Sequence, residues 1–212
     1  MAADLDLQIW AVIGASGTGK GLWVKQKLRE LKPDRFVAWD FKDEYGDFGR
    51  AVPTLAAMKA AMLKAGEGPG RFRYACRGAG EKALRKEFEA LCELVYAWEH
   101  CVFVAEELAN VTTPGWAPAS WRKMTTSGRH AGVHIIGATQ SPALVDKSFL
   151  GNATLAHCCA LRSRLHRQSI AADMDIDEAD IAGLQKFEFL EKDFDTGEVT
   201  RGRVKVPGRR GS

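Results

Sequence analysis

A glycine-rich segment with a lysine has the residue types and the spacing of a phosphate-binding loop. Its sequence, GASGTGKG from Gly14 to Gly21, follows the pattern G-x-x-x-x-G-K. In such a loop, backbone N–H groups surround phosphate oxygens, the next helix N-terminus adds partial positive charge, and the lysine adds a full charge. The alternative is a glycine-rich turn with an exposed lysine. We predict a nucleotide-phosphate site formed by Gly14, Ala15, Ser16, Gly17, Thr18, Gly19, Lys20, Gly21 and Leu22.

One position of this loop departs from the pattern. The motif places Ser or Thr after the lysine because its hydroxyl ligates Mg²⁺, and this chain has Gly21 there. Thr18 and Ser16 belong to the loop but precede Lys20, which is the wrong side for that role. The sequence therefore predicts phosphate binding. It leaves open whether Glu106 or a residue of the Asp43-Glu44 loop replaces the hydroxyl at the metal ion.

Two carboxylates follow an apolar run later in the chain. Glu106 and Glu107 come directly after residues 101–105, CVFVA, which have the composition of a buried parallel strand. Parallel strands direct their carboxyl ends to the ligand crevice, so both side chains are expected to face the phosphate loop. Phosphoryl transfer to water needs a carboxylate that holds Mg²⁺ and a group that positions the water. We assign the metal to Glu106 and the general base to Glu107; the alternative is two exposed acids at a strand end.

A glutamine and an arginine lie on either side of another apolar run, residues 133–138. Gln140 comes shortly after this run, where an amide can hydrogen-bond both the γ-phosphate and the attacking water. Arg129 precedes the run, and an arginine inserted across a subunit interface can stabilise charge on the transferring phosphate. His130 and His134 lack a carboxylate or cysteine at a ligand spacing, so we interpret them as structural. The rival candidates for the trans-acting arginine are Arg77, Arg122 and Arg162.

Alternating strand and helix patterns predict how these residues are positioned. Strands are expected at residues 7–13, 35–40, 71–77, 101–105, 133–138 and 154–161. Helices are expected at 21–31, 54–65, 81–98, up to about 127, and in two pieces within 163–184. Two further runs, 187–190 and 198–206, predict a hairpin around Asp195–Gly197. The alternation implies an α/β fold with a mainly parallel central sheet, helices on both faces and a C-terminal hairpin.

Composition and charge limit the class of protein. A chain of 212 residues with 46% hydrophobic residues suits one domain, which we expect at residues 1–206. The net charge of +3 argues neither for nor against nucleic acid. Residues 201–212 contain five basic residues and no acid, so residues 207–212 are predicted to be a basic tail. Such a tail can hold phosphate backbones or can be a solvated terminus.

The cysteines indicate a reducing compartment, and the apolar runs bear on whether the chain spans a membrane. The five cysteines show neither C-x-x-C spacing nor the density of a disulfide framework. The first residues lack the basic region of a signal peptide, and no apolar run approaches the roughly 20 residues that span a membrane. We therefore expect a cytoplasmic protein without a membrane span.

Four segments together resemble the HerA/FtsK superfamily of DNA-pumping ATPases. They are the phosphate loop, DFKDEYG at 40–46, VFVAEE at 102–107, and GRHAGVHIIGATQSP at 128–142. The second is similar to the family's D-x-x-x-E-Y segment. The last is the most specific, because an arginine, a glycine, an apolar strand and Ala-Thr-Gln-x-Pro are characteristic of the superfamily. The resemblance spans residues 7 to about 206, and is strongest to the genome-packaging ATPases of tailless, membrane-containing icosahedral viruses such as tectiviruses.

The resemblance implies a RecA-like P-loop NTPase of the ASCE class, with core strands in the order 5-1-4-3-2. It implies ATP and Mg²⁺ as cofactors, a hexameric ring, and double-stranded DNA threaded through the pore. The implied activity is ATP hydrolysis coupled to DNA translocation into a viral capsid, with capsid vertex proteins as partners. The implied location is the host cytoplasm or the virion. Because accessory domains are absent, a minimal packaging motor is favoured over a bacterial chromosome translocase.

Other functions stay open at this point. The assembly ATPases of filamentous phages, the zonula-occludens-toxin-like group, are related but normally continue into a membrane span. Nucleoside-monophosphate kinases also use Gly-Lys-Gly, but they need an arginine-rich lid and a monophosphate pocket that the chain does not clearly offer. A non-enzymatic, nucleotide-gated scaffold is the remaining alternative. DNA-stimulated hydrolysis separates the motor from the scaffold, and phosphorylation of AMP identifies the kinase.

Overall fold

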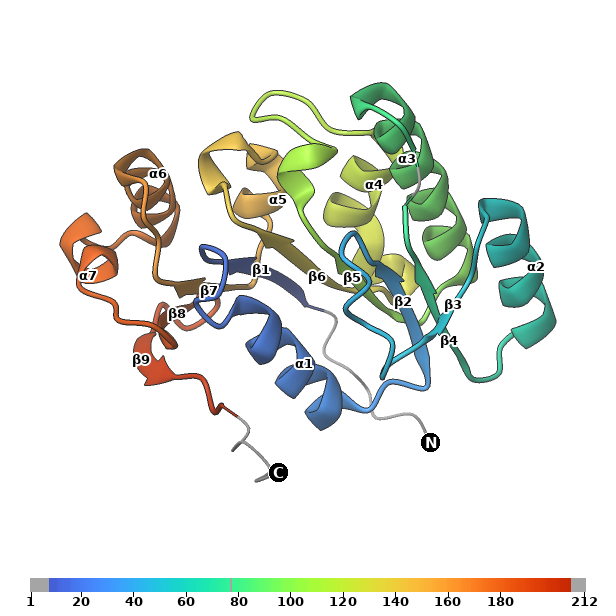
Figure 1. The fold of residues 1–212 in the computed structure, drawn as a ribbon, viewed down its shortest axis with the longest axis horizontal. Helices are drawn as coiled ribbons and strands as arrows, with labels where there is room; N and C mark the ends of the chain where they lie inside the picture. Colours follow the sequence, from blue (N-terminus) through green and yellow to red (C-terminus); the bar gives the residue numbers. More distant parts are fainter. Residues whose placement is uncertain (1–7, 77, 207–212) are drawn as a thin grey trace.

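The computed structural model describes residues 8–76 and 78–206, which build one twisted sheet with helices packed against it (Figure 1). The strand order within the described residues is β3-β4-β2-β5-β6-β1-β7-β8-β9. Neighbours from β3 to β7 are parallel, and the pairs β7–β8 and β8–β9 are antiparallel. The strands are β1 (Ile9–Ile13), β2 (Arg35–Trp39), β3 (Arg50–Ala51), β4 (Gly70–Tyr74), β5 (Val102–Ala105), β6 (His134–Thr139), β7 (Leu155–Cys159), β8 (Glu188–Asp193) and β9 (Val199–Arg203).

The five central strands confirm the expected RecA-like order. Read from β7 to β2 they run β7-β1-β6-β5-β2, which is 5-1-4-3-2 when these core strands are numbered along the chain. On the β2 side β4 and β3 extend the sheet, and on the β7 side the expected C-terminal hairpin, β8–β9, extends it. The helices are α1 (Lys20–Leu31), α2 (Leu55–Ala65), α3 (Glu81–Trp98), α4 (Ala119–Ser127), α5 (Lys147–Gly151), α6 (Arg164–Met174) and α7 (Glu178–Ala182).

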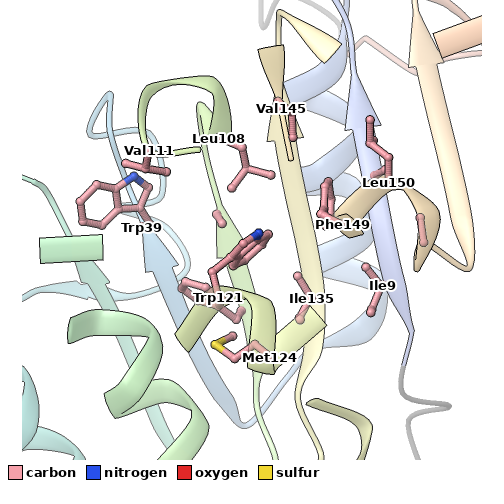
Figure 2. Close-up of a cluster of buried hydrophobic side chains, with 14 of the residues drawn as sticks. Ile9, Trp39, Leu108, Val111, Trp121, Met124, Ile135, Val145, Phe149 and Leu150 are labelled. Carbon is pink, nitrogen blue, oxygen red and sulfur yellow. The ribbon is translucent and has the colours of Figure 1, made fainter. Parts of the chain in front are cut away.

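Helices cover both faces of the sheet, as predicted, but the two faces differ. On one face the core is centred on Trp121 of α4, which is fully buried and lies against the ring of Phe149 (Figure 2). The ring of Phe88 on α3 also lies against Trp121. On the other face the buried side chains of α1, including Trp23, pack against Trp10 and against the residues of β1, β2, β5 and β6 that point to this side. Strand β5 serves both cores because its four residues are all buried and alternate between the faces.

Several expected elements are observed with small differences in their ends. The helix expected at 81–98 is observed as Glu81–Trp98. The strand expected at 71–77 ends earlier, at Tyr74, and β3 and α5 are additions that the sequence pattern did not predict. Arg77 and the predicted basic tail, residues 207–212, lie outside the described residues. None of the described helices is long and apolar enough to cross a membrane.

The parallel strands bring their carboxyl ends to one edge of the sheet. The phosphate loop follows β1, Asp40 follows β2, Glu106 follows β5, and Gln140 follows β6. These four strands are adjacent in the order β2-β5-β6-β1. The short 3₁₀ turn Gly128–Ala131 precedes β6 and therefore lies toward the opposite edge. The fold thus gathers most of the predicted site residues and separates Arg129 from them.

Candidate active site

The loop between β1 and α1 has the backbone shape that its glycines allow. Gly17 and Gly19 have φ angles of 75° and 123°, a region that residues with a side chain rarely adopt. A Cβ on Gly14 would lie 2.7 Å from the Cβ of Cys159, so the loop packs tightly on β7. Helix α1 begins at Lys20, and within the described region no side chain caps its N-terminus. The first N–H groups of the helix are therefore directed at a position suited to an anion.

The C-terminal hairpin supports this loop from outside. The backbone N–H of Phe187 donates a hydrogen bond to the carbonyl oxygen of Thr18 at 3.0 Å. Val204, just after β9, lies so close that a Cβ on Gly19 would be 3.2 Å from its Cγ2. The backbone of Val204 in turn donates to the carbonyl oxygen of Phe187 at 2.7 Å. The conformation of the phosphate loop therefore depends on residues from the far end of the chain.

Glu106 is paired with the lysine of the phosphate loop. Lys20 Nζ lies 3.2 Å from Glu106 Oε2, and both residues are buried. The other carboxylate oxygen, Oε1, accepts a hydrogen bond from the hydroxyl of Tyr45 at 2.5 Å. Burial together with the charge of Glu106 raises the pKa of Tyr45 well above its usual value, so the hydroxyl stays protonated and donates. Both oxygens of Glu106 are therefore satisfied without a bound nucleotide.

Glu107 is held by a lysine and by the predicted glutamine. Lys42 Nζ lies 2.6 Å from Glu107 Oε1, and Gln140 Nε2 donates to the same oxygen at 2.5 Å. Glu107 has a φ of 52°, which turns the chain sharply after β5 and separates its carboxylate from that of Glu106. Burial alone would raise the pKa of Glu107, but the hydrogen bonds from Lys42 and Gln140 and the charge of Lys20 lower it overall. The carboxylate is thus ionised at neutral pH, as a general base requires.

The loop after β2 is folded around a buried aspartate. Asp40 is fully buried and accepts hydrogen bonds from the backbone N–H groups of Glu44 and Tyr45, at 2.8 and 3.1 Å. Its Oδ2 also lies 3.3 Å from a guanidinium nitrogen of Arg73 on β4. This arrangement curls the loop so that Lys42 contacts Glu107 and Tyr45 contacts Glu106. Sequence reasoning used this segment for the resemblance and named its residues Asp43 and Glu44 as alternatives to Glu106 for the missing metal ligand, but assigned no role to Asp40, Lys42 or Tyr45. The available signal was the presence of acidic residues and Tyr45 directly at the end of the strand expected at 35–40.

The predicted arginine is not part of this group in the same chain. Arg129 lies in the 3₁₀ turn before β6, at the edge opposite the phosphate loop. Among its rivals, Arg122 is exposed on α4, whereas Arg162 is exposed just beyond β7 at the edge of the phosphate loop. His134 is buried with its ring edge-on to Trp10, which fits the structural interpretation.

The donors at this edge suit a magnesium ion that is shared with phosphate. No group of three or more His, Cys, Asp or Glu side chains in the described part of the chain could hold a metal ion alone. Mg²⁺ usually binds one or two carboxylates and completes its shell with substrate phosphates and water. Glu106 offers such a carboxylate beside Lys20. The residues present therefore fit Mg²⁺ bound together with a nucleotide.

The chain is similar in sequence to a curated phage protein. No protein-family model matches the chain. Protein P9 of Pseudoalteromonas phage PM2 is 31% identical over 179 residues, which cover 82% of this chain and 78% of P9. The chain belongs to the family of protein P9.

Solved structures share the fold of this P9-family chain. The genome-packaging NTPase B204 of Sulfolobus turreted icosahedral virus 2, solved with ATP-γS, has a TM-score of 0.75 at 16% identity. The likeness covers 97% of this chain and 100% of B204. VirB4 of Thermoanaerobacter pseudethanolicus has a TM-score of 0.70 at 12% identity and covers 98% and 92% of the two chains. At these identities the likeness establishes the fold, and the predicted α/β fold, a RecA-like P-loop NTPase fold with a mainly parallel central sheet, is confirmed.

The contact between Lys42 and Glu107 leads to a prediction on pH dependence. Lys42 helps to lower the pKa of Glu107, so Lys42→Met is expected to raise that pKa. A base with a higher pKa becomes protonated at a higher pH, so the acid limb of the kcat/KM profile for ATP should move to higher pH. Lys42→Arg should keep the wild-type profile, and Lys27→Met, which removes an exposed surface ion pair, is the matched control. An unshifted acid limb in Lys42→Met would show that Glu107 is not the titrating base.

Proposed function

We propose that this P9-family chain is the subunit of an ATP-hydrolysing motor that moves double-stranded DNA into a viral capsid. The main support is the meeting of Lys20, Gln140 and two carboxylates at one edge of a RecA-like sheet. Phosphoryl transfer to water needs these groups. The DNA and capsid parts rest on the resemblance to the tectivirus-like branch of the HerA/FtsK superfamily. B204, which shares the fold, is described as a genome-packaging NTPase.

In this proposal, ATP places its phosphates in the loop between β1 and α1. Lys20 then exchanges its contact with Glu106 for phosphate oxygens, because the polyphosphate has more negative charge than one carboxylate. Glu106 is thereby released at the position where a carboxylate and phosphate oxygens would hold Mg²⁺. When bound, Mg²⁺ neutralises charge that develops on the phosphate oxygens.

Glu107 is the proposed general base, with Gln140 as its partner. The attacking water donates its proton to the carboxylate of Glu107, whose ionised form is favoured by its neighbours Lys42 and Gln140. Gln140 contacts Glu107 through its amide nitrogen, and the amide oxygen stays available to orient the water. The two residues together fix the water and remove its proton, which are the two tasks required at this step.

Arg129 is proposed to act on the nucleotide of a neighbouring subunit in a hexameric ring. Its backbone lies before β6, and the six residues of that strand span about 20 Å, so its backbone is far from the phosphate loop of its own chain. This separation supports a role across an interface, where an arginine stabilises charge on the transferring phosphate. Capsid vertex proteins are the proposed docking partners, and the proposed location is the host cytoplasm or the virion.

The motor is tested by ATP hydrolysis with and without double-stranded DNA, together with the mass of the protein in solution. We expect a ring whose ATPase activity rises with DNA of any sequence, since a translocating ring contacts phosphates and not base edges. If about six phosphates are contacted, DNA affinity should fall about 10³-fold between about 50 and 200 mM salt. Removal of residues 207–212 should weaken DNA binding modestly and leave basal hydrolysis unchanged.

Two results would contradict the proposal in different ways. Rings that hydrolyse ATP but neither bind DNA at low salt nor respond to it would indicate a nucleotide-gated assembly factor. Phosphorylation of AMP would indicate a nucleoside-monophosphate kinase.

A further inference from the structure

The position that lacks the motif's hydroxyl has a carboxylate next to it. Gly21 is the second residue of α1, where phosphate loops place Ser or Thr. A Cβ on Gly21 would lie 3.4 Å from Glu44 Oε2, an ordinary van der Waals separation. An oxygen ligand is therefore present beside the site of the missing hydroxyl, supplied by a different segment of the chain.

Glu44 is brought there by the loop that also contacts Glu106. The backbone N–H of Glu44 donates to Asp40, and the next residue, Tyr45, is fully buried and donates its hydroxyl to Glu106. The same short loop thus positions the carboxylate of Glu44 and, through Tyr45, also holds the carboxylate of Glu106.

The side chain of Glu44 is available to a cation. Its side chain is 44% exposed, and its ion pair with Lys25 is long, with 3.5 Å between Lys25 Nζ and Glu44 Oε2. An exposed pair of this kind contributes little free energy, so a divalent ion can displace the lysine at low cost. By contrast, Glu106 is buried between Lys20 and Tyr45.

We propose that Glu44 replaces the phosphate-loop hydroxyl, so that Mg²⁺ bound with ATP is held by Glu44 and Glu106 together with phosphate oxygens. The inference rests on the proposed ATP site and adds a residue to it. Carboxylate oxygens are suitable ligands for Mg²⁺, and two carboxylates are within the number that such sites use. An anionic ligand in place of a neutral hydroxyl makes the site more dependent on the divalent ion, because without it Glu44 repels the phosphates.

The test measures nucleotide binding and not turnover. The affinity for ATP-γS is measured by calorimetry in Mg²⁺ and in EDTA, and the ratio of the two dissociation constants gives the gain due to the metal. Glu44→Gln keeps the shape and the backbone contacts of the loop but removes the charge. We expect it to reduce the gain about tenfold or more, with unchanged or tighter binding in EDTA. Electron paramagnetic resonance of Mn²⁺ with ATP-γS should show the same loss of metal affinity.

A second substitution tests whether the two positions are equivalent. Gly21→Ser adds the missing hydroxyl on a Cβ that would lie 3.4 Å from Glu44 Oε2 and, in combination with Glu44→Gln, should restore most of the gain from Mg²⁺. Asp47→Asn removes an exposed acid a few residues away and is the control for charge alone, with an unchanged gain. A full gain in Glu44→Gln, or no recovery in the double variant, would overturn the inference and leave the ATP site standing. If the wild type binds no nucleotide in either condition, the proposed function fails and this inference with it.

Discussion

Glu107→Gln is expected to lower the rate of ATP hydrolysis by about 10²–10⁴-fold and to leave ATP affinity unchanged, because a general base contributes a factor of this size. The substitution preserves shape, and the amide oxygen of the new glutamine can still accept from Lys42 and Gln140, which now contact Glu107. Only the ability to take a proton is lost. Single-turnover hydrolysis and equilibrium binding of ATP measure the two quantities separately.

The controls for this prediction come from two other glutamates. Glu30→Gln alters an exposed pair on α1 and should behave as the wild type. Glu106→Gln should weaken the Mg²⁺-dependent binding of ATP, whereas Glu107→Gln should leave it unchanged. Wild-type turnover in Glu107→Gln would transfer the role of base to Glu106.

Lys20→Ala is expected to lower the rate of ATP hydrolysis by at least about 10²-fold and to weaken nucleotide binding as well. The lysine supplies the full positive charge of the loop, so its loss affects bound ATP and the transition state together. In the free protein the same change leaves Glu106 buried with Tyr45 as its remaining partner. Loss of one member of a buried pair is destabilising, here by roughly 3 kcal/mol or less.

A double variant separates the effect on folding from the effect on function. Lys20→Ala combined with Glu106→Gln removes the uncompensated charge, so the free energy of unfolding in urea should recover toward the wild-type value. Nucleotide binding should not recover, since the phosphates still lack the lysine. Recovery of both would mean that Lys20 acts only through the stability of the fold.

The residues of this site whose positions were predictable from the sequence are those that follow the carboxyl ends of strands. Glu106 and Gln140 could be placed because each follows an apolar run and parallel strands share one edge. The helix Glu81–Trp98 was found with both ends because its apolar residues recur at helical spacing over 18 residues. Strand β3 has two residues, which is too short for any periodic pattern.

The contacts of Lys42 and Tyr45 with the two glutamates were not predictable in the same way. They depend on how the loop after β2 folds around Asp40, and this depends on Arg73 from β4. The relevant partners are 33 residues apart for Asp40 and Arg73, and 65 for Lys42 and Glu107. Local patterns contain no information on such pairings. The role proposed for Arg129 involves a second copy of the chain, whose position local patterns do not predict.

The support that the C-terminal hairpin gives to the phosphate loop has a consequence for the order in which the molecule is made. Strand β1 and helix α1 are synthesised first, yet β1 pairs only with β6 and β7 among the described strands, and Thr18 contacts Phe187. Contacts between residues this far apart are slow to form. On the ribosome, the residues of the phosphate loop exist long before their neighbours do. The phosphate loop therefore gains the support of Phe187 and Val204 only after these late residues have been made, and a nascent chain that ends before them lacks it.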